Sequence, residues 1–197
     1  MSSTLVLAFL AAAIPSFFSP GPNNLMLMAS SAKFGLSRTV PHAFGIIIGF
    51  PLMVFGVGLG LGEVFERFPA LHTVLKFVAA ANLLWIAWTL IGLRIGDVKA
   101  DERPLRFHEA ALFQWVNPKA WGMAISFVAI ALGPRGDAMF LLVALTLGCL
   151  ALAPFSSIVW MGFGAQLKSI LRRTGGERYL GPVMAGLMVL AVILFLI

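Results

Sequence analysis

The 197-residue chain is 60% hydrophobic and 11% charged, with a mean hydropathy of +0.97. Soluble domains carry about 25% charged residues, so this composition indicates a protein embedded in a lipid bilayer. Cys149 is the single cysteine, which excludes a disulfide framework and a thiolate metal cluster, and we expect no cofactor or metal. The net charge of +6 does not indicate nucleic-acid binding, because the basic residues lie in short loops between apolar segments.

Six apolar segments predict membrane-spanning helices. A hydrocarbon core of about 30 Å requires about 20 helical residues, and most of the segments reach that length. They run approximately over residues 4–31, 40–62, 70–93, 110–132, 138–164 and 180–197. The first segment lacks the charged start of a signal peptide and is too long for one, so we expect a retained span. The predicted fold is an all-α integral membrane protein.

The basic residues predict the orientation of these spans. The odd-numbered loops contain Lys33, Arg38, Arg94, Lys99, Arg103, Arg106, Lys168, Arg172, Arg173 and Arg178. The even-numbered loops contain only Arg67 and Arg135. Because Lys and Arg concentrate on the cytoplasmic side of membrane proteins, the odd loops are predicted to be cytoplasmic and both termini periplasmic.

The polar segment LRIGDVKADERPLRFHEA, residues 93–110, divides the chain into two sets of three spans. We predict a single transmembrane domain over residues 1–197, with a first half to about residue 93, a cytoplasmic loop over 94–109 and a second half from about residue 110. Three spans in each half give the halves inverted orientations, as in many secondary transporters. In such proteins the substrate site lies where corresponding spans are interrupted.

The first span contains the motif SPGPNN, which predicts an interruption of the helix. Pro20 and Pro22 remove two backbone donors, and Gly21 permits a close approach of the backbone. Asn23 and Asn24 can then cap a half-helix that starts there. Unpaired backbone at membrane depth is tolerated only inside protein or beside a wet cavity, and a helix start attracts carboxylates. A lone proline is usually a structural kink, but this cluster favours a substrate site.

The fourth span contains QWVNPKAW, residues 114–121, at the corresponding position of the second half. Asn117 and Pro118 predict a second interruption, and Gln114 adds an amide to it. Lys119 is costly inside a membrane and is therefore a candidate for a functional site. A lysine that extends to the cytoplasmic interface explains the sequence equally well.

Three further polar residues each have two interpretations. Asn82 lies within the third span and either joins helices by hydrogen bonds or contributes to the substrate site. His42, at the start of the second span, and Glu109, before the fourth, are candidates for proton coupling, although an interfacial position also explains the histidine. No predicted span contains a central Asp or Glu, so the sequence leaves the proton carrier open.

Sequence motifs of enzymes are absent. The chain has no phosphate-binding loop, no HExxH, no GxSxG and no cluster of metal ligands. The spans offer only scattered serines, His42 and Cys149 for a nucleophile–base pair, so we do not expect an enzyme. The alternative to a transporter is a non-transporting membrane subunit or an intramembrane enzyme, but a structural subunit would not need two costly helix interruptions.

The motifs SPGPNN, GLSRTVPHAFGIIIGF and FHEAALFQWVNPKAWGMAISF resemble those of the LysE/RhtB family of bacterial amino-acid exporters. The resemblance covers nearly the whole chain, including its length, its six predicted spans and its basic central loop. It implies a secondary carrier in the bacterial inner membrane that exports small amino acids and is driven by the proton-motive force. The implied partners are the amino acid, protons and the lipid bilayer, and homo-oligomers are compatible with it.

The resemblance also implies which residues form the site. The family motifs carry over to Pro20, Gly21, Pro22, Asn23, Asn117, Pro118 and Lys119. Two branches are suggested, one exporting cysteine and O-acetylserine and one exporting homoserine and threonine. Two departures leave the substrate open. Asn82 ends an Ala-Ala-Ala-Asn stretch where members commonly have Gly-Ala-x-Tyr, and Glu109 replaces a common glycine.

Overall fold

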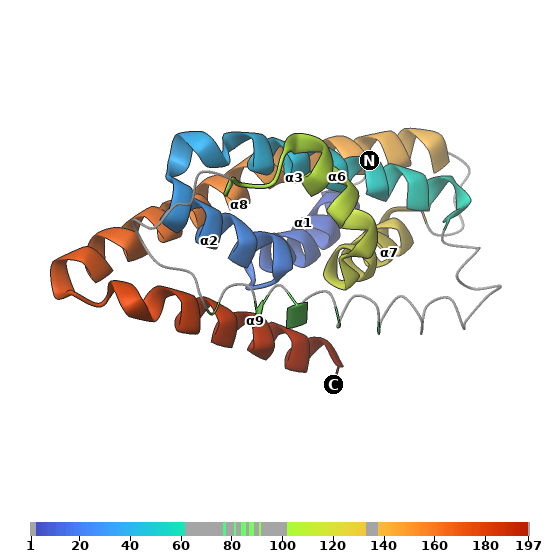
Figure 1. Ribbon diagram of the computed structural model, residues 1–197. Helices are drawn as coiled ribbons and strands as arrows, with labels where there is room; N and C mark the ends of the chain where they lie inside the picture. The colour runs from blue at the N-terminus through green and yellow to red at the C-terminus, as the bar shows by residue number, and fades with distance from the viewer. Residues whose placement is uncertain are drawn as a thin grey trace.

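The computed structural model describes residues 3–61, 102–132 and 138–196, together with residues 77, 81, 84, 85, 87, 88 and 91. Its helices are α1 (Ser3–Phe18), α2 (Pro22–Phe34), α3 (Leu36–Gly56), α6 (Phe107–Phe113), α7 (Pro118–Leu132), α8 (Ala138–Thr174) and α9 (Leu180–Leu196). Shorter helical turns cover Val57–Leu61, Gln114–Val116 and Glu177–Tyr179. This part of the chain contains no strands (Figure 1). Most of the predicted span 70–93, including Asn82, lies outside the described residues.

Several of these helices fit a bilayer. Leu36–Gly60 and Ala138–Thr174 are each long and apolar enough to cross it. Helices α1 and α2 pass the same test as one span bent by 43°. The described residues therefore contain two candidate spans, or three if the bent pair counts as one span. This agrees with the predicted first, second and fifth spans, and the described part of the chain has the all-helical fold expected of a membrane protein.

Helix α8 is longer than predicted. It ends at Thr174, whereas the predicted fifth span ended at residue 164. At about 1.5 Å per residue it extends over about 55 Å, well beyond a hydrocarbon core of about 30 Å. The additional turns carry Lys168, Arg172 and Arg173, so the helix continues into water as a charged extension.

Both predicted helix interruptions are confirmed. Helix α1 ends at Phe18 and α2 begins at Pro22, the first helical position, where a missing N–H has no consequence. In the second half, α6 ends at Phe113, a short turn follows, and α7 begins at Pro118. The backbone of Asn117 between them is extended.

The described helices pack around two apolar cores. One core joins α1, α3 and α7 through Phe9, Phe17, Phe50 and Phe127, and Leu145 and Cys149 of α8 pack into the same core. Phe127 lies against each of the other three rings, with centroid distances of 5.5 to 6.4 Å. The other joins α2, α3, α8 and α9, the last of which lies along one side of the molecule (Figure 1). Because α1 belongs to the first core and α2 to the second, the interruption between them lies where the two cores meet.

Glycines on α3 bring α6 close to it. A Cβ atom at Gly49 would lie 2.6 Å from Ala111 Cα, and one at Gly45 would collide with the carbonyl oxygen of Phe107. Small residues of this kind allow helix backbones to approach in membranes. This contact fixes the position of α6 and of the turn that follows it.

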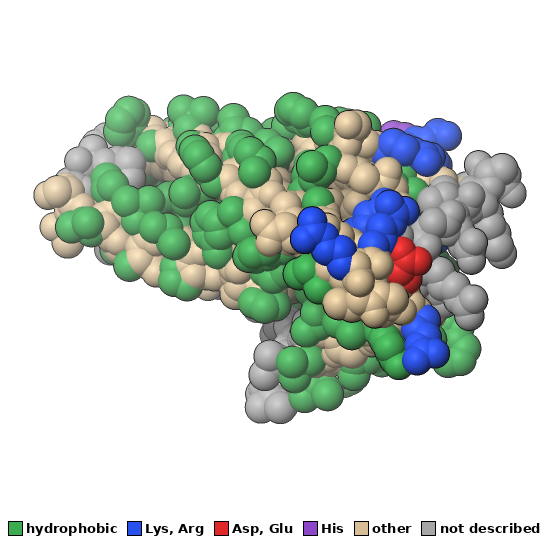
Figure 2. Space-filling model, turned by 90° about the vertical axis from the view of Figure 1, so that its left-hand side faces the viewer, with side chains coloured by type: hydrophobic (Ala, Val, Ile, Leu, Met, Phe, Trp, Pro, Cys, Tyr) green, Lys and Arg blue, Asp and Glu red, His purple; other side chains and the backbone are tan. Residues whose placement is uncertain are grey.

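The surface is largely apolar. Leu52, Trp88 and Phe155 are 60%, 75% and 62% exposed. Figure 2 shows hydrophobic side chains over much of the visible face, with Lys and Arg gathered in one part of it. Lipid around the apolar part and water around the charged part account for this distribution.

Candidate functional site

The two helix interruptions meet inside the protein. Asn23 Nδ2 donates a hydrogen bond to Gln114 Oε1 at 2.8 Å, and Gln114 Nε2 donates to Asn23 Oδ1 at 3.2 Å. Gln114 Nε2 also donates to the Ala110 carbonyl at 2.9 Å, and the Gln114 side chain is fully buried. Paired amides thus join α2 to the turn between α6 and α7, 91 residues away in sequence.

Asn24 caps the end of α1. Its Nδ2 donates to the carbonyls of Phe17 at 2.8 Å and Ser19 at 2.9 Å, and Ser156 Oγ on α8 donates to the same Phe17 carbonyl at 2.6 Å. These contacts satisfy carbonyls that the end of α1 leaves without helical partners.

The start of α2 has no side-chain cap. The prediction that Asn23 and Asn24 cap it is therefore wrong. With Pro22 as the first helical residue, both asparagines already lie within the first turn, and their side chains bond elsewhere. The first backbone bond of the helix runs from Leu25 N–H to the Gly21 carbonyl at 2.9 Å. The backbone N–H groups of Asn23 and Asn24 precede that bond, so they are left as donors at the interruption.

Lys119 reaches from the second interruption to the first. Its Nζ donates to Ser19 Oγ at 2.8 Å, to the Ser19 carbonyl at 2.9 Å and to the Pro20 carbonyl at 3.3 Å. A Cβ atom at Gly21 would lie 2.6 Å from Lys119 Cδ, so only glycine leaves room for the lysine. Lys119 therefore binds inside the junction and does not extend away from it.

Asn117 lies directly before α7 and binds the backbone of Lys119 through its side chain. Its Oδ1 accepts a hydrogen bond from Lys119 N–H at 3.1 Å, which caps the start of α7. The ion pairs among the described residues join Lys33 to Glu102, Arg103 to Glu109 and Arg172 to Glu177. Within that part of the chain no carboxylate neutralises Lys119.

A cavity lies between the two interruptions, α3 and α8. Its polar lining consists of Ser16, Gly21, Asn23, Asn24, Asn117, Lys119, Ser156 and Ser157. Its apolar lining consists of Phe17, Ile46, Phe50, Ala120, Met123 and Ala153. The volume open to the centres of water molecules is about 40 Å³. One water requires about 10–15 Å³ on this measure, so the cavity has room for a few waters or for one small polar solute.

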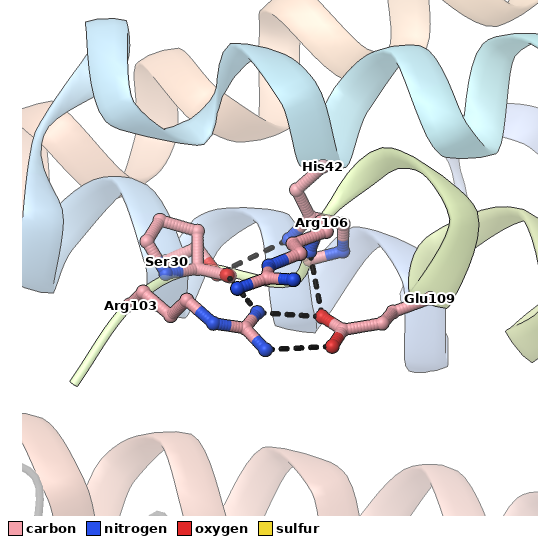
Figure 3. Close-up of polar contacts among 6 residues, drawn as sticks. Ser30, His42, Arg103, Arg106 and Glu109 are labelled. Atoms are coloured by element: carbon pink, nitrogen blue, oxygen red, sulfur yellow. Dashed lines mark hydrogen bonds and ion pairs between the residues drawn. The ribbon is translucent and has the colours of Figure 1, made fainter. Parts of the chain in front are cut away.

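Glu109 is held by arginines on one side of this site (Figure 3). Arg103 Nη1 and Nη2 donate to its two carboxylate oxygens at 2.6 and 2.7 Å, and Arg106 N–H donates at 2.7 Å. The hydrogen bonds from Arg103, followed by the one from Arg106, lower the pKa of Glu109 to about 2. The carboxylate is therefore ionised at neutral pH and caps the start of α6.

His42 is buried between α2 and α3. Its side chain is 1% exposed, and its Nδ1 lies 3.2 Å from Ser30 Oγ, within hydrogen-bonding distance (Figure 3). The packing of α2 on α3 encloses the imidazole in protein, and its depth in the bilayer stays a prediction. Neither His42 nor Glu109 lines the cavity.

Comparison with known proteins identifies the family. The model of the LysE type translocator family matches residues 14–197, nearly the whole chain. This chain belongs to the LysE type translocator family. Members of this family are transporters, so this LysE type translocator is an integral membrane transport protein and not an enzyme.

Curated relatives of this LysE type translocator are named as efflux proteins. The cysteine/O-acetylserine efflux protein of Salmonella paratyphi A is 24% identical over 192 residues, covering 96% of each chain. The cysteine/O-acetylserine efflux protein of Escherichia coli K12 is 23% identical over the same length and coverage. No solved structure matches the chain.

The translocator brings most of the sequence-predicted site residues together. Residues of both motifs line the cavity or lie directly behind it; these are Pro20, Gly21, Pro22, Asn23, Asn24, Gln114, Asn117, Pro118 and Lys119. Pro22 and Pro118 start helices, and the Pro20 carbonyl accepts from the lysine. Asn82 lies outside the described residues.

Three polar cavity residues are not predicted by the sequence analysis. Ser16 on α1 and Ser156 and Ser157 on α8 line the cavity. The signal on α8 is the stretch Ala153-Pro154-Phe155-Ser156-Ser157, in which a proline and two adjacent hydroxyls interrupt an apolar run.

Proposed function

We propose that this translocator exports small amino acids from the cytoplasm by secondary active transport coupled to protons. The observation that carries the proposal is the cavity at the junction of two interrupted helices, with Lys119 beside it and no described carboxylate to neutralise that lysine. The names of the curated relatives support amino acids as the substrate class.

The substrate carboxylate binds at the start of α2. There the backbone N–H groups of Asn23 and Asn24 are left as donors, and the positive end of the helix dipole adds to them. The ammonium of Lys119, held by the Ser19 and Pro20 carbonyls, supplies a full positive charge on the same side of the cavity. Charge-assisted hydrogen bonds of this kind are roughly twice as strong as neutral ones.

The substrate ammonium binds to the side-chain oxygen of Asn24, beside the end of α1. The Phe17 and Ser19 carbonyls each accept two hydrogen bonds already, Phe17 from Asn24 and Ser156 and Ser19 from Asn24 and Lys119. The Asn24 side-chain oxygen has only a long contact of 3.4 Å to Ser156 Oγ, so it keeps acceptor capacity. A zwitterion therefore finds donors on one side of the interruption and an acceptor on the other.

Transport follows from the position of this site between the halves of the chain. We propose six spans in two inverted sets of three, which rock around the junction to expose it alternately to the two sides. We propose the bacterial inner membrane as its location because of the helical spans and the family resemblance, and periplasmic termini because of the distribution of Lys and Arg.

Of the two candidates for proton coupling, His42 fits better. Glu109 accepts three hydrogen bonds and has a pKa of about 2, so it keeps its charge throughout the physiological range. The imidazole of His42 has a hydroxyl partner, Ser30, and no ion-pair partner among the described residues, so no neighbouring charge fixes its protonation. It lies one helical turn from Ile46, which lines the cavity.

The test is release of labelled amino acids from proteoliposomes that contain the purified protein. We expect release of small neutral amino acids to accelerate when the outside is made acidic and to fall to the level of protein-free liposomes when a protonophore is added. A panel of amino acids from which none is released above that level would overturn the proposal. Release that a protonophore leaves unchanged would overturn the coupling alone.

A further inference from the structure

We infer that Ser157 forms a hydrogen bond with the substrate side chain, so that this residue determines the preference of the site for small polar side chains over apolar ones of the same size. The inference rests on the proposed function and adds a residue that determines specificity. It comes from the distribution of hydrogen bonds among the polar groups that line the cavity.

The hydroxyl of Ser157 has no hydrogen-bond partner among the described residues. The Ser157 side chain is 4% exposed and lines the cavity. A serine in a helix commonly donates to the carbonyl four residues earlier, and buried polar groups are nearly always paired. The adjacent Ser156, equally buried, does donate its hydrogen, to the Phe17 carbonyl at 2.6 Å.

The neighbouring polar groups are already in use. Asn23 is paired with Gln114, Ser16 Oγ donates to the Ala12 carbonyl at 2.7 Å, and Lys119 has three oxygen acceptors. Asn117 accepts with its side-chain oxygen and has its Nδ2 left as a donor, which suits a carboxylate. Ser157 differs from all of these because its free group both donates and accepts.

A hydroxyl that both donates and accepts hydrogen bonds suits a restricted set of substrate side chains. A hydroxyl or thiol can donate to it and accept from it, and an ester oxygen can accept from it, whereas a methyl group leaves it unpaired. The apolar walls formed by Phe17, Phe50 and Met123 limit the size of that side chain. None of the lining residues is Asp or Glu, so a cationic side chain would have no counter-charge and would lie near Lys119.

The experiment is counterflow in proteoliposomes with two pairs of nearly isosteric substrates. Serine is compared with alanine, and cysteine with 2-aminobutyrate, so that each pair differs in one polar group. If the polar member of each pair gains one hydrogen bond, the wild-type protein should take it up about two- to tenfold faster than the apolar member. We expect Ser157→Ala to reduce both ratios to about one. Thr146→Val is the control on the same helix and should keep the wild-type ratios, because the Thr146 hydroxyl donates to the Leu142 carbonyl at 2.8 Å and does not line the cavity.

The outcomes separate this inference from the function on which it rests. If the wild type takes up polar and apolar substrates equally, or if Ser157→Ala keeps the wild-type uptake ratios, the role of Ser157 is overturned. The proposed function as an amino-acid exporter would be unaffected by either result. Absence of counterflow with every amino acid would instead overturn the proposed function. If Ser157→Ala does not accumulate in the membrane, Ser157→Thr must keep the preference and the similarly shaped Ser157→Val must lose it. The opposite result would refute the inference.

Discussion

Asn23 and Gln114 exchange two hydrogen bonds, of 2.8 and 3.2 Å, across the junction of the two interrupted helices. One residue belongs to the first half of the chain and the other to the second, so the pair is a direct polar link between the halves. Since Gln114 is fully buried, its amide has no water to replace a lost partner.

The first prediction concerns this amide pair. Asn23→Ala should lower the stability of the protein by about 1–3 kcal/mol, the cost of leaving a buried amide unpaired, and should abolish efflux while protein remains in the membrane. The double variant Asn23→Ala/Gln114→Ala should be less destabilised than the sum of the two single variants. Thermal unfolding in detergent and efflux assays measure both effects. Additive losses of stability would contradict a direct interaction.

The second prediction concerns the space around Lys119. A methyl group at position 21 would lie 2.6 Å from Lys119 Cδ and 3.0 Å from its Nζ, so Gly21→Ala should displace the ammonium and strongly reduce efflux. Gly122→Ala is the matched control, because a Cβ atom there meets nothing within 4 Å. In the α7 helix that change should be neutral or stabilising by up to about 1 kcal/mol. Equal efflux by the two variants would show that the fit between Gly21 and Lys119 has no role.

The third prediction concerns pH. His42→Gln should flatten the pH dependence of efflux, because glutamine cannot gain and lose a proton as an imidazole does. Glu109→Gln should leave the shape of that profile unchanged. The pKa of Glu109 is lowered to about 2 in the folded protein, so its contribution to stability is complete above the unfolded pKa of about 4.3 and is lost only as the pH falls toward 2. A flattened profile in Glu109→Gln with an unchanged one in His42→Gln would reverse the assignment.

The fourth prediction concerns binding without transport. A substrate that occupies the cavity at about 100 times its Kd should stabilise the wild-type protein by about 2.7 kcal/mol. Amino acids that are exported should therefore raise the unfolding temperature of the purified protein. Lys119→Gln should show little or no such shift, because the positive charge beside the cavity is gone. A full shift in this variant would place the substrate away from Lys119.

The helix interruptions were predictable because their causes are local. Single prolines lie inside continuous helices of this protein, as Pro15, Pro41, Pro51 and Pro154 do. Two prolines around a glycine, and an Asn-Pro pair, instead end the helix that precedes them.

The capping role of Asn24 was not predictable, because it depends on how the first turn of α2 faces the end of α1. Helix α8 continues beyond the predicted end of the fifth span because Lys168 and Arg172 are good helix formers in water.

The cavity itself could not be derived from the sequence. Pattern analysis places Gln114 and Asn23 on separate spans, and only the packing of α6 against Gly45 and Gly49 brings them together. Ser157 was overlooked because a serine in an apolar helix normally bonds to its own backbone. Its missing partner becomes visible only when every hydrogen bond around the cavity is known.

The central claim is that the junction of the two interruptions binds the exported amino acid beside Lys119. It is tested most directly by efflux of a labelled small amino acid from proteoliposomes with acid outside, comparing the wild type, Lys119→Ala and the exposed-charge control Arg173→Ala. We predict that the wild type and Arg173→Ala release the label at similar rates, while Lys119→Ala, reconstituted in equal amount, releases it no faster than protein-free liposomes. Release by Lys119→Ala at the wild-type rate would contradict the claim.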